Sequence, residues 1–163
     1  MSAIVALSLS ACSQAAKAAG PAPTLQTHAV AGYGEVLANS AGYSLYVLST
    51  ESAGMLRCTS GACLASWPPL LVAKNSMITA GSGVSGKISH VTRGSKWQVT
   101  YNGWPVYSFN GDSGPGQSNG EKLSSFGGTW YLAGAAATTN PGTPVKAMAS
   151  GSTTSTTAAS GGY

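Results

Sequence analysis

The chain of 163 residues is long enough for one domain, because domains commonly contain roughly 100 to 200 residues. Only 7% of its residues are charged, and eight cations are scattered singly against four carboxylates, which gives a net charge of +4. The chain has no basic stripe that could follow a phosphate backbone, so nucleic acid is not an expected partner. The composition also excludes a large multidomain enzyme, a coiled coil and a polytopic membrane protein.

The apolar residues indicate a small core that is rich in aromatic side chains. The hydrophobic share is 43%, but 25 of these residues are Ala, while Leu, Ile, Val and Phe together number only 27. Such a low aliphatic share predicts disorder only when the net charge is high, and here four Trp and seven Tyr supply apolar bulk. We therefore predict a mainly β fold, a small single domain with flexible termini.

The N-terminus opens with a short apolar run that leads into Leu-Ser-Ala-Cys at residues 9–12. This tetrapeptide resembles a bacterial lipobox, in which the Cys receives diacylglycerol and becomes the mature N-terminus. We therefore interpret residues 1–11 as a signal peptide and residues 12–28 as a lipidated tether, held to the membrane by acyl chains on Cys12. The positively charged n-region of such signals is missing, and an ordinary Ala-rich helix start is the alternative.

Between the ends, alternating apolar residues and turn signals predict short strands. In chain order these are residues 35–39, 43–49, 87–92, 96–101, 104–109 and 129–133. The turn at Asn102-Gly103 is the clearest, since both residues can adopt positive φ in a type I′ turn. Residues 60–66 are predicted to form one helical turn that ends at Trp67-Pro-Pro.

The C-terminal residues are predicted to be a disordered tail. Residues 135–163 consist mainly of Ala, Thr, Gly, Ser and Pro, which cannot bury enough surface to offset the entropy of ordering. The folded domain is therefore expected over residues 29–134.

An internal repeat is visible when the chain is shifted along itself. The shift superposes Gly42 on Gly103, Tyr46 on Tyr107 and Glu51 on Asp112. Each copy has the pattern strand, turn, strand. We therefore predict two pseudo-symmetric β-hairpin repeats.

Cys58 and Cys63 flank a Thr-Ser-Gly-Ala turn, and an exported chain would fold in an oxidising compartment. A structural disulfide that closes a small loop is the favoured interpretation. A zinc site is a rival, but zinc needs two further ligands, and the chain offers only His28 and His90. A redox-active pair is the third alternative, although C-x4-C lacks the thioredoxin-type spacing.

Several motifs together resemble one known family. Tyr107-Ser-Phe109-Asn-Gly-Asp112 matches the Y-x-[FWY]-x-x-D signature of the bacterial secreted-repeat lipoproteins, and the cysteine pair followed by Trp-Pro-Pro is similar to other blocks of that family. The first copy departs from the signature, because Leu48 replaces the aromatic residue and Glu51 replaces Asp. The resemblance covers residues 35–131 and implies an exported lipoprotein with two repeats and unassigned activity.

Glu51 and Asp112, two of only four carboxylates, are the strongest candidates for a site. Together with Tyr46, Tyr107 and Phe109 they form the repeat motif. Symmetry could bring the two carboxylates to equivalent places, as a general acid/base pair or a metal site requires. The structural alternative is that each carboxylate closes a turn by accepting backbone N–H bonds.

Two other motifs resemble functional sequences without their usual context. Gly111-Asp-Ser-Gly resembles the segment around a serine-protease nucleophile, but it follows a hairpin in a chain too short for a two-barrel protease. Residues 81–87 have the glycine spacing of phosphate-binding loops, but Ile88 stands where a Ser or Thr should bind magnesium. We predict a flexible connector there.

The remaining candidates are a histidine, two methionines and the tryptophans. His90 on an alternating strand is typical of a packed or exposed side chain, while a copper site with Met55 or Met77 is the alternative. The four tryptophans could line a groove for a sugar or quinone, but a domain poor in Leu and Ile needs their area for its core. They are Trp67, Trp97, Trp104 and Trp130.

These observations predict an extracytoplasmic, membrane-anchored lipoprotein of the bacterial cell envelope. It is expected to be a non-enzymatic module without a cofactor, which binds a ligand or an envelope protein. The alternative is a metal or redox accessory protein, for copper or a similar ion, that binds through Glu51, Asp112 or His90. An enzyme is the third class.

Overall fold

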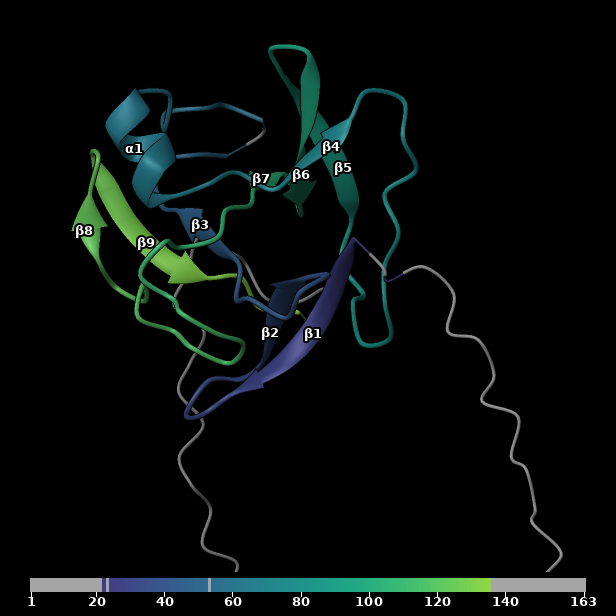
Figure 1. The fold of residues 1–163 in the computed structure, drawn as a ribbon, viewed down its shortest axis with the longest axis vertical. Helices are drawn as coiled ribbons and strands as arrows, with labels where there is room; N and C mark the ends of the chain where they lie inside the picture. The colour runs from purple at the N-terminus through teal and green to yellow at the C-terminus, as the bar shows by residue number, and fades with distance from the viewer. Residues whose placement is uncertain (1–21, 23, 53, 136–163) are drawn as a thin grey trace, which may run out of the picture.

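The computed structural model describes residues 22, 24–52 and 54–135 (Figure 1). The expected signal peptide, Cys12 and all but the first residue of the expected tail lie outside the described residues. The described part is mainly β, as predicted, with one short helix. Its elements are β1 Leu25–Val30, β2 Gly34–Asn39, β3 Tyr46–Leu48, α1 Gly61–Ser66, β4 Leu71–Ala73, β5 Ile88–Arg93, β6 Lys96–Tyr101, β7 Trp104–Pro105, β8 Ser124–Ser125 and β9 Gly128–Leu132.

The strands form small antiparallel sheets. One sheet contains β1 and β2, a second has the order β3-β9-β8, and a third has the order β4-β6-β5 with β7 also paired to β6. In Figure 1, β8, β9 and α1 lie on one side of the molecule, and β4, β5 and β6 lie on the other. The first predicted hairpin is divided between two sheets, because β2 pairs with β1 and β3 pairs with β9, whereas β6 and β7 of the second hairpin pair with each other. The sheet topology therefore does not show the pseudo-symmetry of the repeats.

Local sequence explains the best-predicted elements. Asn102 and Gly103 have φ values of 49° and 85°, which is the type I′ geometry that joins β6 to β7. Helix α1 begins after Ser60, whose side chain accepts a hydrogen bond from the Cys63 N–H, and it ends at Trp67. Cys58 and Cys63 form the predicted disulfide.

The N-terminal boundary differs from the sequence prediction. Strand β1 begins at Leu25, inside the segment expected to be tether, and its residues 25–30 pair with β2. Leu25 is fully buried, and its N–H donates to the Thr79 carbonyl at 3.1 Å. Residues 25–28 therefore belong to the folded domain, since burial and distant pairing stabilise a strand that has weak alternation of its own. At the other end Ala135 is also buried.

The core has two clusters of buried residues. The first contains Trp67, Trp130, Tyr46, Tyr107 and the disulfide, with Trp67 stacked on Trp130 at a ring separation of 3.9 Å. The second is aliphatic for the most part and packs between the β1–β2 ribbon and β6. Only two of the four tryptophans are fully buried. Trp97, on the central strand β6 of the third sheet, and Trp104, on β7, are half-buried.

Candidate functional site

The two motif tyrosines meet at the centre of the first cluster. The Tyr46 N–H donates to the Tyr107 carbonyl at 2.8 Å, and the Tyr107 N–H donates back to the Tyr46 carbonyl at 2.9 Å. Both side chains are completely buried. The two copies of the motif are therefore joined directly through their backbones.

The tyrosine side chains cross over to the opposite copy. Tyr46 Oη donates to Asp112 Oδ2 at 2.7 Å, and Tyr107 Oη donates to Glu51 Oε1 at 3.0 Å. Burial raises the pKa of both hydroxyls above the ordinary value, and the neighbouring carboxylates raise the pKa further. Both hydroxyls are thus protonated donors at neutral pH. Each copy supplies the acceptor for the other copy's tyrosine.

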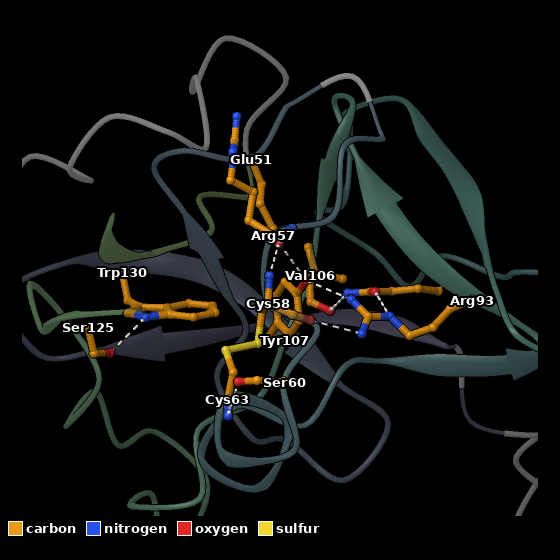
Figure 2. The surroundings of a disulfide bond; sticks show 11 residues. Glu51, Arg57, Cys58, Ser60, Cys63, Arg93, Val106, Tyr107, Ser125 and Trp130 are labelled. Carbon is orange, nitrogen blue, oxygen red and sulfur yellow. Dashed lines mark hydrogen bonds between the residues drawn. A yellow bond between two sulfur atoms is a disulfide. The ribbon is translucent and has the colours of Figure 1, made fainter. Parts of the chain in front are cut away.

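We call the surroundings of Glu51 the Glu51 end, and Figure 2 shows them beside the disulfide. Besides the Tyr107 hydroxyl, Glu51 Oε1 accepts the backbone N–H groups of Arg57 and Cys58 at 2.6 and 2.8 Å. Glu51 has no exposed surface, and its Oε2 has no hydrogen-bond partner among the described residues. The carboxylate therefore closes the turn that leads into the disulfide loop.

Arg93 of β5 completes the Glu51 end. Its guanidinium donates to the Tyr107 hydroxyl at 3.1 Å, to the Cys58 carbonyl at 3.0 Å and to Gln98 Oε1 at 2.7 Å (Figure 2). The cation lies over the Tyr107 ring, with 5.9 Å between its central carbon and the ring centroid. A half-buried positive charge thus faces the tyrosine that bonds to the buried Glu51.

The surroundings of Asp112, the Asp112 end, are more open. Asp112 Oδ1 accepts the Asn119 N–H at 2.9 Å, and Asp112 remains 5% exposed. The Ser113 N–H and hydroxyl both bond to Gln117 Oε1, at 2.6 and 3.2 Å. Gly111-Asp-Ser-Gly is therefore part of a turn held by polar side chains.

A groove opens beside Asp112. It has a volume of about 310 Å³, and we call it the motif groove; its lining residues are Asn39, Tyr43, Pro68, Ser108, Phe109, Asn110 and Asp112. A second hollow of about 340 Å³, the Lys87 pocket, is lined by Gly54, Lys87, Ser89, His90, Thr100, Asn102 and Gly103. Of these two hollows, the motif groove is the one that contains signature residues.

The candidate metal ligands are dispersed. His90 stacks on Trp97 with 3.6 Å between ring centroids, Met55 is 51% exposed and Met77 is 84% exposed. Glu51 and Asp112 are bonded to different tyrosines. In the part of the chain that the structure describes, no three His, Cys, Asp or Glu side chains gather into a group that could hold a metal ion.

The fold and site define a small, disulfide-bonded β domain in which two motif copies interlock through tyrosines and carboxylates. Residues 89–133 match the model of the Lipoprotein_15 family, described as a secreted repeat of unknown function, which confirms the resemblance stated above. The matched range contains Tyr107, Phe109 and Asp112 and begins well after Glu51. The family description indicates an extracytoplasmic location.

The chain was also compared with curated proteins and with solved structures. No curated protein and no solved structure matches the chain. None of the helices in the described ranges is long and apolar enough to cross a membrane.

Sequence reasoning did not identify several residues that shape the site. Arg93, Gln98 and Asn119 form its hydrogen bonds, while Tyr43 and Asn39 line the motif groove. One available signal is that Tyr46 to Glu51 and Tyr107 to Asp112 have the same spacing. A buried tyrosine hydroxyl needs an acceptor, so the repeated pair of residue types points to tyrosine–carboxylate bonds, but not to which tyrosine bonds to which carboxylate.

Proposed function

We propose that the protein is a lipoprotein, anchored to the bacterial cell envelope by acyl chains on Cys12, that acts as a non-enzymatic binding module. The observation that supports this most is that both motif carboxylates are buried acceptors for tyrosine hydroxyls and backbone N–H groups. A general base has to reach the proton that it removes from a substrate. Glu51 cannot do so from a fully buried position.

The motif groove supports a binding role for the remaining carboxylate. Asp112 is the only acidic residue among those that line it. Glycoside hydrolysis, to take one reaction of envelope polymers, ordinarily needs two carboxyl groups that flank the bond to be broken. A groove with one carboxylate, already committed to two hydrogen bonds, is suited to holding a ligand.

We further propose that the two motif copies are pseudo-symmetric halves of one interlocked unit. Each half contributes a tyrosine donor and a carboxylate acceptor, and each bond joins the two halves. Neither half can satisfy its own tyrosine within the arrangement seen here. The two copies accordingly stabilise one domain together, and we assign binding to the surface of that domain.

The enzymatic alternative can be tested with charge-removing substitutions. Asp112→Asn and Glu51→Gln should each lower the free energy of unfolding by about 1 to 3 kcal/mol, because each weakens a buried bond to an ionised acceptor. Glu35→Gln, at an exposed carboxylate on β2, is the matched control and should change it by less than about 0.5 kcal/mol. An Asp112→Asn variant that unfolds normally but loses a hydrolytic activity of the wild type would establish an enzyme instead.

Anchoring is tested by the mass of the mature protein. The full chain, isolated from the membranes of a bacterial host that processes lipoproteins, should begin at Cys12 and carry acyl chains. The Cys12→Ser variant should no longer be found in the membrane fraction. An unmodified N-terminus in the wild type would refute the lipid anchor but would not contradict the proposed binding role.

A further inference from the structure

The lining of the motif groove indicates what kind of ligand it would take. Tyr43 and Phe109 present aromatic rings, Asn39 and Asn110 present amides, and Ser108 presents a hydroxyl. No Lys, Arg or His is among the lining residues. With one carboxylate and no cation, the groove does not favour a phosphate or another anion.

Several groups in the groove remain available to a ligand. Asn39 uses Oδ1 to accept the N–H groups of Ala41 and Tyr43, at 2.9 and 3.1 Å, and within the described ranges its Nδ2 has no acceptor. Among the described residues, neither the Tyr43 hydroxyl nor the exposed Asn110 side chain is engaged in a hydrogen bond. Donors and acceptors therefore stand beside an aromatic surface.

The groove is also held in place before any ligand arrives. The Phe109 ring packs against Trp67 at 4.3 Å between centroids and meets Tyr46 edge-on at 6.3 Å. The bonds from Tyr46 and Asn119 fix the Asp112 carboxylate. Fixed side chains reduce the entropy that binding would cost.

We propose that the motif groove binds a short neutral oligosaccharide. A sugar ring has an apolar C–H face that packs on an aromatic ring, and hydroxyl groups at its edge that bond to amides and carboxylates. The groove offers this combination. Its volume of about 310 Å³ is near the lower end of ligand pockets, so the bound segment is short and the dissociation constant should be about 0.1 to 1 mM.

This inference rests on the proposed binding function and deepens it. The test uses the oxidised full chain and three neutral probes, maltotriose, cellotriose and triacetylchitotriose, each titrated to about ten times the expected dissociation constant. Binding is measured by calorimetry and by saturation-transfer NMR. At least one trisaccharide should bind, with saturation strongest on the ring protons.

Substitutions locate the site. Tyr43→Ala and Asn110→Ala change half-buried and exposed side chains, and each should weaken binding at least about fivefold to tenfold while the unfolding transition is retained. Tyr43→Phe keeps the ring and should weaken binding less than Tyr43→Ala. Lys87→Ala, in the Lys87 pocket, is the matched control and should leave binding unchanged.

Three outcomes would overturn the inference. They are no binding of any probe, binding that Tyr43→Ala and Asn110→Ala leave intact, and binding that Lys87→Ala abolishes. A decaproline peptide is titrated in parallel, because extended Pro-rich segments also dock in aromatic-lined grooves. If only the decaproline peptide binds and Tyr43→Ala abolishes that binding, the oligosaccharide inference fails while the proposed binding function stands. If neither the trisaccharides nor the peptide bind at the motif groove, the proposed binding function is also contradicted at this site.

Discussion

The Glu51 end and the Asp112 end use the same tyrosine–carboxylate bond in different surroundings. Glu51 is fully buried, accepts two backbone N–H groups and sits next to the disulfide, whereas Asp112 accepts one backbone N–H and borders a groove. Glu is longer than Asp by one methylene, and its Oε1 accepts the N–H groups of Arg57 and Cys58 beside the disulfide. One repeated motif thus stabilises both ends of the domain, while Asp112 at one end also lines the motif groove.

The residues that depart from the family signature lie at the Glu51 end. Leu48 is fully buried where the second copy has the half-buried Phe109. An aliphatic side chain fills core space, while Phe109 packs on Trp67 and also lines the motif groove. Of the two positions that depart, Leu48 fills the core and Glu51 accepts N–H groups of the disulfide loop, whereas Phe109 and Asp112 line the motif groove.

The largest difference between the ends should appear when the carboxylates are removed. Glu51→Ala leaves two backbone N–H groups and the Tyr107 hydroxyl without their acceptor in the core, so we expect a loss of at least about 3 kcal/mol in the free energy of unfolding. Asp112→Ala should cost about 1 to 3 kcal/mol, because water in the groove can replace part of the lost bonding. Denaturant unfolding measures both; equal losses would contradict the comparison.

Breaking the disulfide should also lower stability, and the effect should fall on the Glu51 end. Replacing Cys58 and Cys63 together by Ser opens a loop with a sequence separation of 5, for which chain entropy predicts a loss of about 2 kcal/mol. The Cys58 N–H and carbonyl also hold Glu51 and Arg93. Amide hydrogen exchange should therefore accelerate around residues 51–58 more than around residues 112–119, and uniform acceleration would argue against local coupling.

Alkaline unfolding tests the tyrosines. The pKa of Tyr46 and Tyr107 in the folded state is raised by burial above the ordinary 10.0, so above pH 10 the unfolded chain loses protons that the folded chain keeps. The unfolding free energy must then fall as pH rises, by about 1.4 kcal/mol per pH unit for each such tyrosine. Tyr46→Phe and Tyr107→Phe should each reduce this slope.

Those two substitutions also differ at neutral pH. Tyr107→Phe removes one bond to the buried carboxylate of Glu51 and one from the Arg93 cation, and it should cost about 2 to 3 kcal/mol. Tyr46→Phe removes the bond to Asp112 and a longer bond from the Gly120 N–H at 3.4 Å, and it should cost about 1 to 2 kcal/mol. The order of the two losses is measured by urea titration. A larger loss for Tyr46→Phe would show that the Asp112 end contributes more to stability.

The smallest predicted effect concerns Glu121, which belongs to neither end. Burial raises the pKa of this carboxyl, while its Oε2 accepts the Leu132 N–H at 2.6 Å. The folded state therefore keeps this proton longer than the unfolded state, and its contribution to stability is lost as pH rises through the raised pKa. The wild type should therefore lose a small amount of stability between pH 4 and pH 7, because solvent screens this half-buried group, and Glu121→Gln should remove that loss. An unchanged pH profile would contradict this.

Local chemistry made part of the fold predictable. The Asn102-Gly103 turn, the helical turn after Ser60 and the bond between Cys58 and Cys63 each depend on residues fewer than seven positions apart. Strand β1 could not be predicted in the same way. Its Leu25 is stabilised by backbone bonds to Thr79 and Gly81, more than fifty residues away.

The sequence allowed the main residues of the site to be predicted, but not the hydrogen bonds between them. The repeat identified Tyr46, Glu51, Tyr107 and Asp112, yet spacing within a copy cannot reveal that each tyrosine bonds to the other copy. Arg93 is one of several scattered cations in the sequence. Its place beside Tyr107 depends on how β5 packs against the disulfide loop, and no short-range pattern encodes that contact.

Double-mutant cycles on the four motif residues test the crossed arrangement most directly. We predict coupling energies of about 0.5 to 3 kcal/mol between Tyr46→Phe and Asp112→Asn, and between Tyr107→Phe and Glu51→Gln. The same-copy combinations, Tyr46→Phe with Glu51→Gln and Tyr107→Phe with Asp112→Asn, should couple by less than about 0.5 kcal/mol. Stronger coupling within a copy than across the copies would contradict the interlocked unit.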